Sequence, residues 1–231
     1  MKIGIIGAMS VEVALLKEKM TQLTVTEHCG MSFFDGVLEG TPCVVVQCGV
    51  GKVNAALCVQ ILCDCYEVSH IVNTGVAGSL DAKLDIGDFV ISRDAVYHDF
   101  DVRPLGYTIG QVPGFSVREF TADDALISCA ISAAEQVYPG HACVGRVASG
   151  DQFVSDRQCK ERIIADTGAV CTEMEGAAIA HAAWRNGIPF VILRAISDKA
   201  DDSAQMDYPT FEEIAAKRCA AVVQAFVKQM S

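Results

Sequence analysis

The stretch PFVILRAISD (189–198) decides the fold class of this chain. It is a near-continuous run of apolar, β-prone residues, whereas a strand with one face in water would alternate apolar and polar residues. A strand buried on both faces is typical of a central sheet that helices cover from two sides. Six further runs have the same character, at 2–9, 42–51, 70–78, 87–96, 141–151 and 169–175.

Helix-like segments alternate with these runs. The segment SVEVALLKEKM, for example, begins with Ser10, a residue suited to a helix N-cap, and continues with apolar side chains at helical spacing. The alternation predicts a single α/β domain over 1–231, with a central, mostly parallel or mixed twisted sheet flanked by helices on both faces. The helices are expected at 10–22, 52–66, 122–137, 155–166, 176–187 and 209–229.

Composition argues against several classes of protein. The chain has 18 basic and 29 acidic residues, and its net charge of −11 would repel the phosphate backbone of a nucleic acid. No apolar run is long enough to span a bilayer, and the N-terminal segment lacks a signal-peptide pattern, so we expect a cytoplasmic protein without a membrane partner. The 11 cysteines form no C-x-x-C pair and stand apart from the five histidines, which argues against a metal site.

Candidate ligand-binding residues follow the predicted strands. Open α/β sheets bind ligands beyond the carboxyl ends of their strands. Met9 and Glu12 follow the first run, and the third run ends in the glycine-rich NTGVAGSL. In the last run, Arg194 and Asp198 are expected to share one face of the strand, about 13 Å apart at roughly 3.3 Å per residue. These side chains are therefore expected to meet at one edge of the sheet.

The stretch AVCTEMEGAAIAHAAW (169–184) places two carboxylates at the start of what reads as a buried helix. Because a carboxylate is costly to bury unless something binds it, this stretch suggests a ligand. Glu175 heads the helix, where the dipole favours negative charge, and its lone pairs can take both hydrogens of a cis-diol. We expect Glu173 to serve structure, and the Met174 thioether to suit a flat ring or a thioether ligand.

Two further segments are informative. Residues 97–120 fit neither a strand nor a helix, and a segment this long with Gly, Pro and aromatic residues indicates function or an interface. The glycine-rich GVGKVNAA (49–56) is not a phosphate loop, because Val46 stands where that pattern needs glycine and Val53 where it needs Ser or Thr. We expect it to pack a strand tightly against a helix.

Six motifs occur in one order along the chain: KIGIIGAMSVEV, NTGVAGSL, YHDFDV, SGDQF, TEMEGAAIAH and RAISDKAD. Together they resemble the 5'-methylthioadenosine/S-adenosylhomocysteine nucleosidases of the nucleoside phosphorylase superfamily, and the resemblance covers the whole chain. It implies a nucleoside phosphorylase-like fold and a hydrolase that breaks the bond between ribose C1' and adenine N9 without a metal or organic cofactor. The implied substrates are 5'-methylthioadenosine, S-adenosylhomocysteine and 5'-deoxyadenosine, and the implied role is methionine salvage and recycling of S-adenosylmethionine by-products.

The resemblance also implies a role for each matching residue. Glu12 would activate the attacking water, Asp198 would protonate adenine N7, and Arg194 would organise the water and Glu12. Glu175 would accept hydrogen bonds from the ribose hydroxyls. The other implied substrate-binding residues are Met9, Val76, Phe153, Val154, Met174, Ser197 and Tyr208.

A homodimer is implied as well, in which the 97–120 loop of a neighbouring subunit closes the substrate pocket. Val102, Leu105, Tyr107 and Pro113 stand at the matching places. A dimer would also cover apolar side chains that this loop would expose in a monomer. Two positions depart from the family: members often have a serine where Val76 stands and an aromatic residue where Leu105 stands.

Three alternatives remain open. A nucleoside phosphorylase would need cationic groups for phosphate, but the matching regions carry Glu12 and Asn73 and no arginine. A nucleosidase acting on aminofutalosine in menaquinone synthesis would differ in the 5' substituent, which the 97–120 loop and Tyr208 would contact. A non-catalytic nucleoside-binding module would not need both Glu12 and Asp198.

Overall fold

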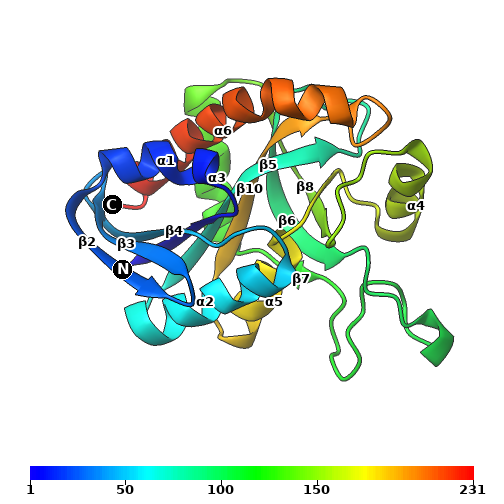
Figure 1. The fold of residues 1–231 in the computed structure, drawn as a ribbon, viewed down its shortest axis with the longest axis horizontal. Helices are drawn as coiled ribbons and strands as arrows, with labels where there is room; N and C mark the ends of the chain where they lie inside the picture. The colour runs from blue at the N-terminus through cyan, green and yellow to red at the C-terminus, as the bar shows by residue number, and fades with distance from the viewer.

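Ten strands form one sheet in the computed structural model, which describes residues 1–231 (Figure 1). Their spatial order is β10-β6-β8-β9-β5-β1-β4-β3-β2, and the short β7 pairs with β6. The strands are β1 (Ile3–Gly7), β2 (Thr21–His28), β3 (Met31–Leu38), β4 (Thr41–Gln47), β5 (His70–Ser79), β6 (Phe89–Tyr97), β7 (Phe120–Thr121), β8 (Ala142–Ser149), β9 (Cys171–Glu173) and β10 (Phe190–Asp198).

Parallel and antiparallel pairs both contribute to this sheet. β1 is parallel to β4 and β5, and β8 is parallel to β6 and β9. β10 runs parallel to β5 on one side and antiparallel to β6 on the other. Because β9 also pairs with the end of β5, strands β5, β10, β6, β8 and β9 close into a ring. The predicted α/β fold is confirmed, and its sheet is mixed.

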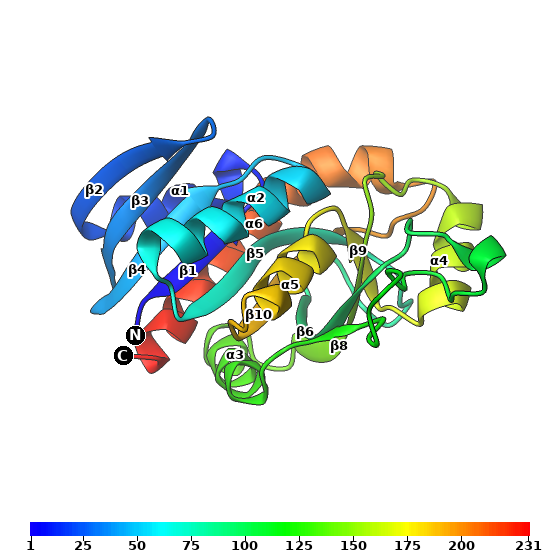
Figure 2. The ribbon, with the colours of Figure 1, turned by 90° about the horizontal axis from the view of Figure 1, so that it is seen from below.

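Neighbouring residues of the central strands enter different hydrophobic cores, which explains the continuous apolar runs. Ile6 and Val46 belong to the core under α2 (Lys52–Tyr66) and α5 (Gly176–Arg185). Ile5 and Val45 belong to the core under α1 (Ser10–Lys19), α3 (Asp124–Val137) and α6 (Ala204–Gln229). Helices therefore cover the sheet on both faces (Figure 2). The helices are α1 (Ser10–Lys19), α2 (Lys52–Tyr66), α3 (Asp124–Val137), α4 (Arg157–Thr167), α5 (Gly176–Arg185) and α6 (Ala204–Gln229).

Three details differ from the sequence-based expectation. The hairpin of β2 and β3 occupies 21–38, where no strand was predicted, because β2 is an exposed edge strand without a buried apolar run; the helix predicted at 10–22 ends at Lys19 instead. The last helix begins at Ala204 and contains Pro209, so the predicted start at that proline is wrong. Ser10 is the first residue of α1, and Met9 occupies the N-cap position instead.

The segment between β6 and β7 holds only a short 3-10 helix at Arg103–Leu105. It projects away from the sheet (Figure 1). Its irregular structure fits the expectation from the sequence. Separately, none of the helices combines the length and the apolar character that crossing a membrane requires.

Candidate active site

A pocket lies at the carboxyl ends of β1, β5, β9 and β10. Its empty space, which includes the part open to solvent, is about 480 Å³. Val154 lines a smaller pocket that shares several of the same residues. The other ten residues predicted to bind or react with substrate all line the main pocket, namely Met9, Glu12, Val76, Phe153, Met174, Glu175, Arg194, Ser197, Asp198 and Tyr208.

The four residues predicted to act from a neighbouring subunit lie outside this pocket. They belong to the segment between β6 and β7, and Leu105 is 72% exposed. A single chain therefore does not bring them to its own site. These residues are Val102, Leu105, Tyr107 and Pro113.

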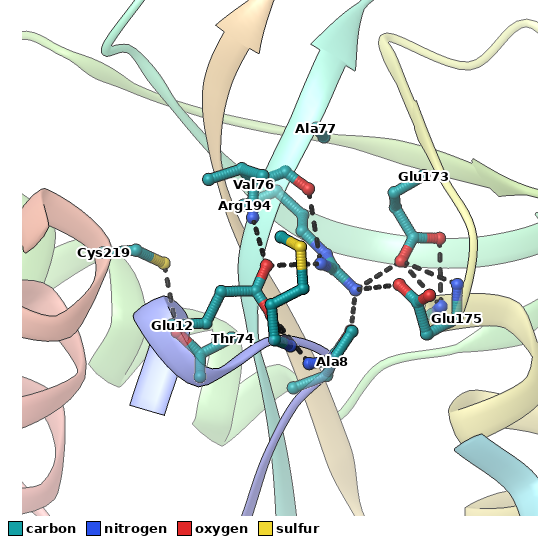
Figure 3. Close-up of polar contacts among 12 residues, drawn as sticks. Ala8, Glu12, Thr74, Val76, Ala77, Glu173, Glu175, Arg194 and Cys219 are labelled. Atoms are coloured by element: carbon teal, nitrogen blue, oxygen red, sulfur yellow. Dashed lines mark hydrogen bonds and ion pairs between the residues drawn. The ribbon is translucent and has the colours of Figure 1, made fainter. Parts of the chain in front are cut away.

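Glu12 is fixed in the first turn of α1 by three backbone donors (Figure 3). Its Oε2 accepts hydrogen bonds from the amides of Ala8 at 2.7 Å and Met9 at 2.9 Å, and its Oε1 accepts from the amide of Val76 at 3.1 Å. Burial raises the pKa of Glu12, although Arg194 and these amides oppose the shift. The carboxyl group is thus held in one position and binds a proton more readily than an exposed glutamate does.

Arg194 joins three carboxyl groups at the centre of the site (Figure 3). Its Nη2 binds Glu173 and lies 3.7 Å from Oε2 of Glu175. Its Nη1 lies 4.0 Å from Oε1 of Glu12 and donates to the carbonyl of Val76 at 3.3 Å. The side chain is 1% exposed, and only Nε lacks a partner. This buried cation therefore partly offsets the charge that the three glutamates bring into the site.

The approach of Arg194 to Glu12 depends on a glycine in β5. A Cβ at Gly75 would meet Nη1 of Arg194 and Oε1 of Glu12. The glycine-rich end of the third run therefore has a steric function, which is to leave room for two charged side chains.

Glu173 contacts Arg194 and the start of α5 at the same time. Its carboxylate accepts hydrogen bonds from the amides of Gly176 at 2.8 Å and Glu175 at 3.2 Å, and it binds the hydroxyl of Ser149. These contacts fit the structural role expected from the sequence. They also show that Glu173 positions the guanidinium, which sequence reasoning missed because no local pattern pairs Glu173 with Arg194.

Glu175 receives a hydrogen bond from a distant turn. The amide of Gly51 donates to its Oε1 at 2.8 Å, and Gly51 has a φ of 98°, which other residues rarely adopt. The glycine turn that the sequence suggested only as a packing device therefore also holds a carboxylate of the site. Burial, together with the neighbouring Glu173, raises the pKa of Glu175 to about 7.

Asp198 ends β10 beside an irregularity of the sheet. The register between β10 and β5 shifts between Ile196 and Asp198, so Ser197 and Asp198 both line the pocket and the simple alternation expected for this strand does not hold. Oδ1 of Asp198 accepts from the amide of Ala200 at 2.8 Å, and Oδ2 accepts from the hydroxyl of Ser197 at 2.9 Å. Burial raises the pKa of Asp198, and these two hydrogen bonds oppose the shift.

Comparisons with known proteins agree with this arrangement. Residues 2–228 match the model of the phosphorylase superfamily. A 5'-methylthioadenosine/S-adenosylhomocysteine nucleosidase from Geobacillus thermodenitrificans (strain NG80-2) is 41% identical over 224 residues, which cover 96% of this chain and 94% of that protein. The chain belongs to this nucleosidase family. The resemblance predicted from the six motifs is therefore confirmed.

Two solved structures are similar over nearly the whole length. The nucleosidase from Colwellia psychrerythraea 34H, in complex with adenine, is 41% identical and superposes with a TM-score of 0.95, covering 99% of this chain and 95% of that chain. A futalosine hydrolase from Helicobacter pylori is 31% identical with a TM-score of 0.94, covering 99% of this chain and 97% of that chain. The nucleosidase fold is thus shared with a hydrolase that is named for a different nucleoside.

An aromatic pair borders the pocket of this nucleosidase family member. The rings of Phe153 and Tyr208 lie edge to face, with centroids 5.4 Å apart. The hydroxyl of Tyr208 donates to Sδ of Met9 at 3.2 Å. Since Phe153 is 46% exposed, this pair lies where the pocket meets solvent.

Proposed function

We propose that this pocket hydrolyses the bond between ribose C1' and adenine N9 of 5'-methylthioadenosine, S-adenosylhomocysteine and 5'-deoxyadenosine. The charge of the pocket carries the proposal. Four carboxyl groups and one guanidinium line it, and the Nη atoms of Arg194 already bind Glu173, Asn73 and the Val76 carbonyl. Such a pocket favours the positive charge that develops on ribose as adenine departs. It would repel phosphate, the co-substrate of a phosphorylase.

The proposed reaction needs a base and an acid. Glu12 takes a proton from a water molecule, and the water oxygen forms a new bond to C1'. The C1'–N9 bond breaks, its electron pair passes to adenine, and Asp198 gives a proton to N7. The raised pKa of Asp198 supports proton donation nearer to neutral pH. General acid and base steps each contribute roughly 10²- to 10⁴-fold.

Other lining residues are proposed to bind the substrate. Glu175 accepts hydrogen bonds from the ribose hydroxyls, and Met174 packs on the sugar. Phe153 stacks near adenine, and Tyr208 lines the alkylthio region. We propose further that the enzyme acts in the cytoplasm, in methionine salvage and the recycling of S-adenosylmethionine by-products.

The enzyme is proposed to work as a homodimer. An apolar groove with about 940 Å³ of empty space lies between α2, α5 and the segment after β6, and Leu57, Phe100 and Val112 line it. Val53, also in this groove, is 72% exposed. Contiguous apolar surface of this kind marks an interface, and a second copy seated on it would bring its own 97–120 loop towards the pocket.

A substitution that places a charge in the groove tests whether the protein is a homodimer. Val53→Asp is expected to yield monomers in sedimentation velocity and to lose activity, because the partner's loop no longer closes the pocket. Ile214→Asp on α6, outside the groove and 52% exposed, is the matched control. An active Val53→Asp monomer would contradict the proposal.

Aminofutalosine hydrolysis is a second candidate function. The similarity to the Helicobacter pylori futalosine hydrolase favours it. Tyr208, which is proposed to line the alkylthio region, also borders the pocket, where a larger 5' substituent would lie. The two candidates share adenine and ribose, so only the 5' substituent separates them.

The deciding experiment measures adenine release from 5'-methylthioadenosine, S-adenosylhomocysteine, 5'-deoxyadenosine and aminofutalosine, each with and without phosphate. Glu12→Gln protein purified in parallel controls for contaminating enzymes. Release without phosphate is expected, and the relative kcat/KM values identify the preferred 5' substituent. Release only with phosphate, or none from any of the four, would overturn the proposal.

A further inference from the structure

The hydroxyl of Thr172 is buried without a hydrogen-bond partner. Thr172 is 5% exposed, and its Oγ1 is one of three buried polar side-chain atoms that have no partner in the chain. An unpaired buried hydroxyl costs free energy, and buried polar groups in native proteins are rarely left so. A hydrogen-bond partner for this hydroxyl must therefore come from outside the chain.

The sheet places Thr172 across from the proposed acid. In the register of the strands, Thr172 of β9 pairs with Gly78 of β5, and Gly78 pairs with Asp198 of β10. With neighbouring strands roughly 4.8 Å apart, the backbones of Thr172 and Asp198 lie about 10 Å apart. Gly78 adds no side chain between them, and a Cβ at that position would touch Asp198.

Thr172 lines the part of the site that suits a flat base. It borders the main pocket and also the smaller adjoining one, which has about 250 Å³ of empty space. Phe153, Val154 and Asp198 line the same smaller pocket, so a ring, an aliphatic side chain and a carboxyl group surround it. A threonine hydroxyl can both donate and accept, and it can therefore pair with any polar atom on the edge of a purine.

We propose that Thr172 is a specificity-determining residue whose hydroxyl hydrogen-bonds a polar edge atom of the adenine base. The proposal rests on the proposed action on adenine nucleosides and adds a base-recognising residue to it. Methionine and aromatic side chains of the site contact any flat ring, whereas a hydroxyl distinguishes a ring with a matching polar atom from one without it. Thr172 thereby selects among purines as well as binding them.

The test compares two variants and a series of bases. Thr172→Val keeps the branched shape that suits a strand and removes only the hydroxyl, whereas Thr172→Ser keeps the hydroxyl. Calorimetric Kd values are measured for adenine, 1-deazaadenine, 3-deazaadenine, 7-deazaadenine and unsubstituted purine. Thr172→Val is expected to bind adenine roughly 5- to 50-fold more weakly than the parent, and Thr172→Ser to stay within about threefold of it.

The pattern across the bases decides the outcome. The analogue that lacks the contacted atom is expected to bind Thr172→Val and the parent equally well. An equal loss for adenine and all four analogues would indicate a merely structural effect and overturn the proposal, as would unchanged affinity for adenine. Should Thr172→Val not fold, Thr172→Ser and the parent must still share one order of preference among the bases, and a different order would overturn the proposal.

The two proposals fail in different ways. Parent protein that releases adenine without phosphate, together with a Thr172→Val variant of unchanged adenine affinity, would remove the role of Thr172 and leave the hydrolysis intact. Parent protein that releases no adenine would remove the hydrolysis, while the Kd series would still report on Thr172.

Discussion

Nη1 of Arg194 lies 4.0 Å from Oε1 of Glu12, and Val76 contacts both side chains. The carbonyl of Val76 accepts from Arg194, and its amide donates to Glu12. The proposed base and the guanidinium are therefore held by one residue of β5. This contact uses only the backbone of Val76, so the departure from serine at this position leaves it intact. A base fixed in advance does not have to reorganise during the reaction.

Glu12→Gln is expected to lower kcat by roughly 10²- to 10⁴-fold, because the amide cannot take a proton from water. For the parent, kcat/KM should fall as the pH drops through the raised pKa of Glu12, since the protonated form cannot act as a base. Glu18→Gln, at an exposed position of the same helix, is the control. Steady-state kinetics of Glu12→Gln within tenfold of the parent would rule out this base.

Asp198→Asn tests the proposed acid. The amide keeps the shape of the side chain and has no transferable proton, so we expect adenine to bind while turnover falls by roughly 10²-fold or more. For the parent, activity should decline as the pH rises through the raised pKa of Asp198, because the ionised carboxylate no longer donates. Asp202→Asn, which is exposed four residues further along, is the matched control. Near-normal turnover of Asp198→Asn would remove the assignment.

Most of the fold could be predicted because a strand that is buried on both faces has a near-continuous run of apolar residues. Each of the seven apolar runs contains one strand of the sheet, from β1 to β10. The β2–β3 hairpin contains no such apolar run, because β2 is exposed. The hairpin is positioned by the pairing of β3 with β4. The antiparallel pairing of β10 with β6 is also decided by the closed ring of strands and not by any local pattern.

The acidic residues of the site could be predicted where they stand at the end of a strand. Contacts between residues that are far apart in the sequence could not. The positions of Glu12 and Asp198 followed from the strands that precede them. The contact of Gly51 with Glu175 joins residues 124 positions apart, and the pairing of Glu173 with Arg194 depends on two strands meeting in space. Neither contact has a sequence spacing that could reveal it.

Glu173→Gln is expected to destabilise the protein, because it removes a charged partner from a buried cation. Breaking such a pair costs roughly 3–5 kcal/mol, and since Glu12 and Glu175 remain near Arg194, we expect a loss of about 2–3 kcal/mol in urea unfolding. Glu161→Gln breaks the exposed pair with Arg157 and should change stability very little, because water screens exposed charges. Equal stabilities of the two variants would show that Glu173 does not anchor the guanidinium.

Glu175→Gln should change stability in a pH-dependent way. The pKa of Glu175 is about 7 in the folded chain, against 4.5 for an ordinary glutamate. Between these values the folded parent binds a proton that the unfolded chain releases, so its stability falls as the pH rises through this window. Glutamine does not titrate, and the Tm of Glu175→Gln relative to the parent should therefore increase from pH 5 to pH 8, at about 2–4 °C per kcal/mol.

The same substitution should separate sugar recognition from base recognition. A neutral amide cannot replace the charge-assisted hydrogen bonds that the carboxylate would make to the ribose hydroxyls, so affinity for a substrate analogue containing ribose should fall roughly tenfold. Affinity for adenine alone should stay within about twofold, since the base makes no bond to Glu175 in this proposal. Isothermal calorimetry at pH 8 on parent, Glu175→Gln and the exposed control Glu18→Gln provides the comparison. If the nucleoside analogue and adenine lose affinity equally, Glu175 supports the shape of the pocket and does not bind the diol.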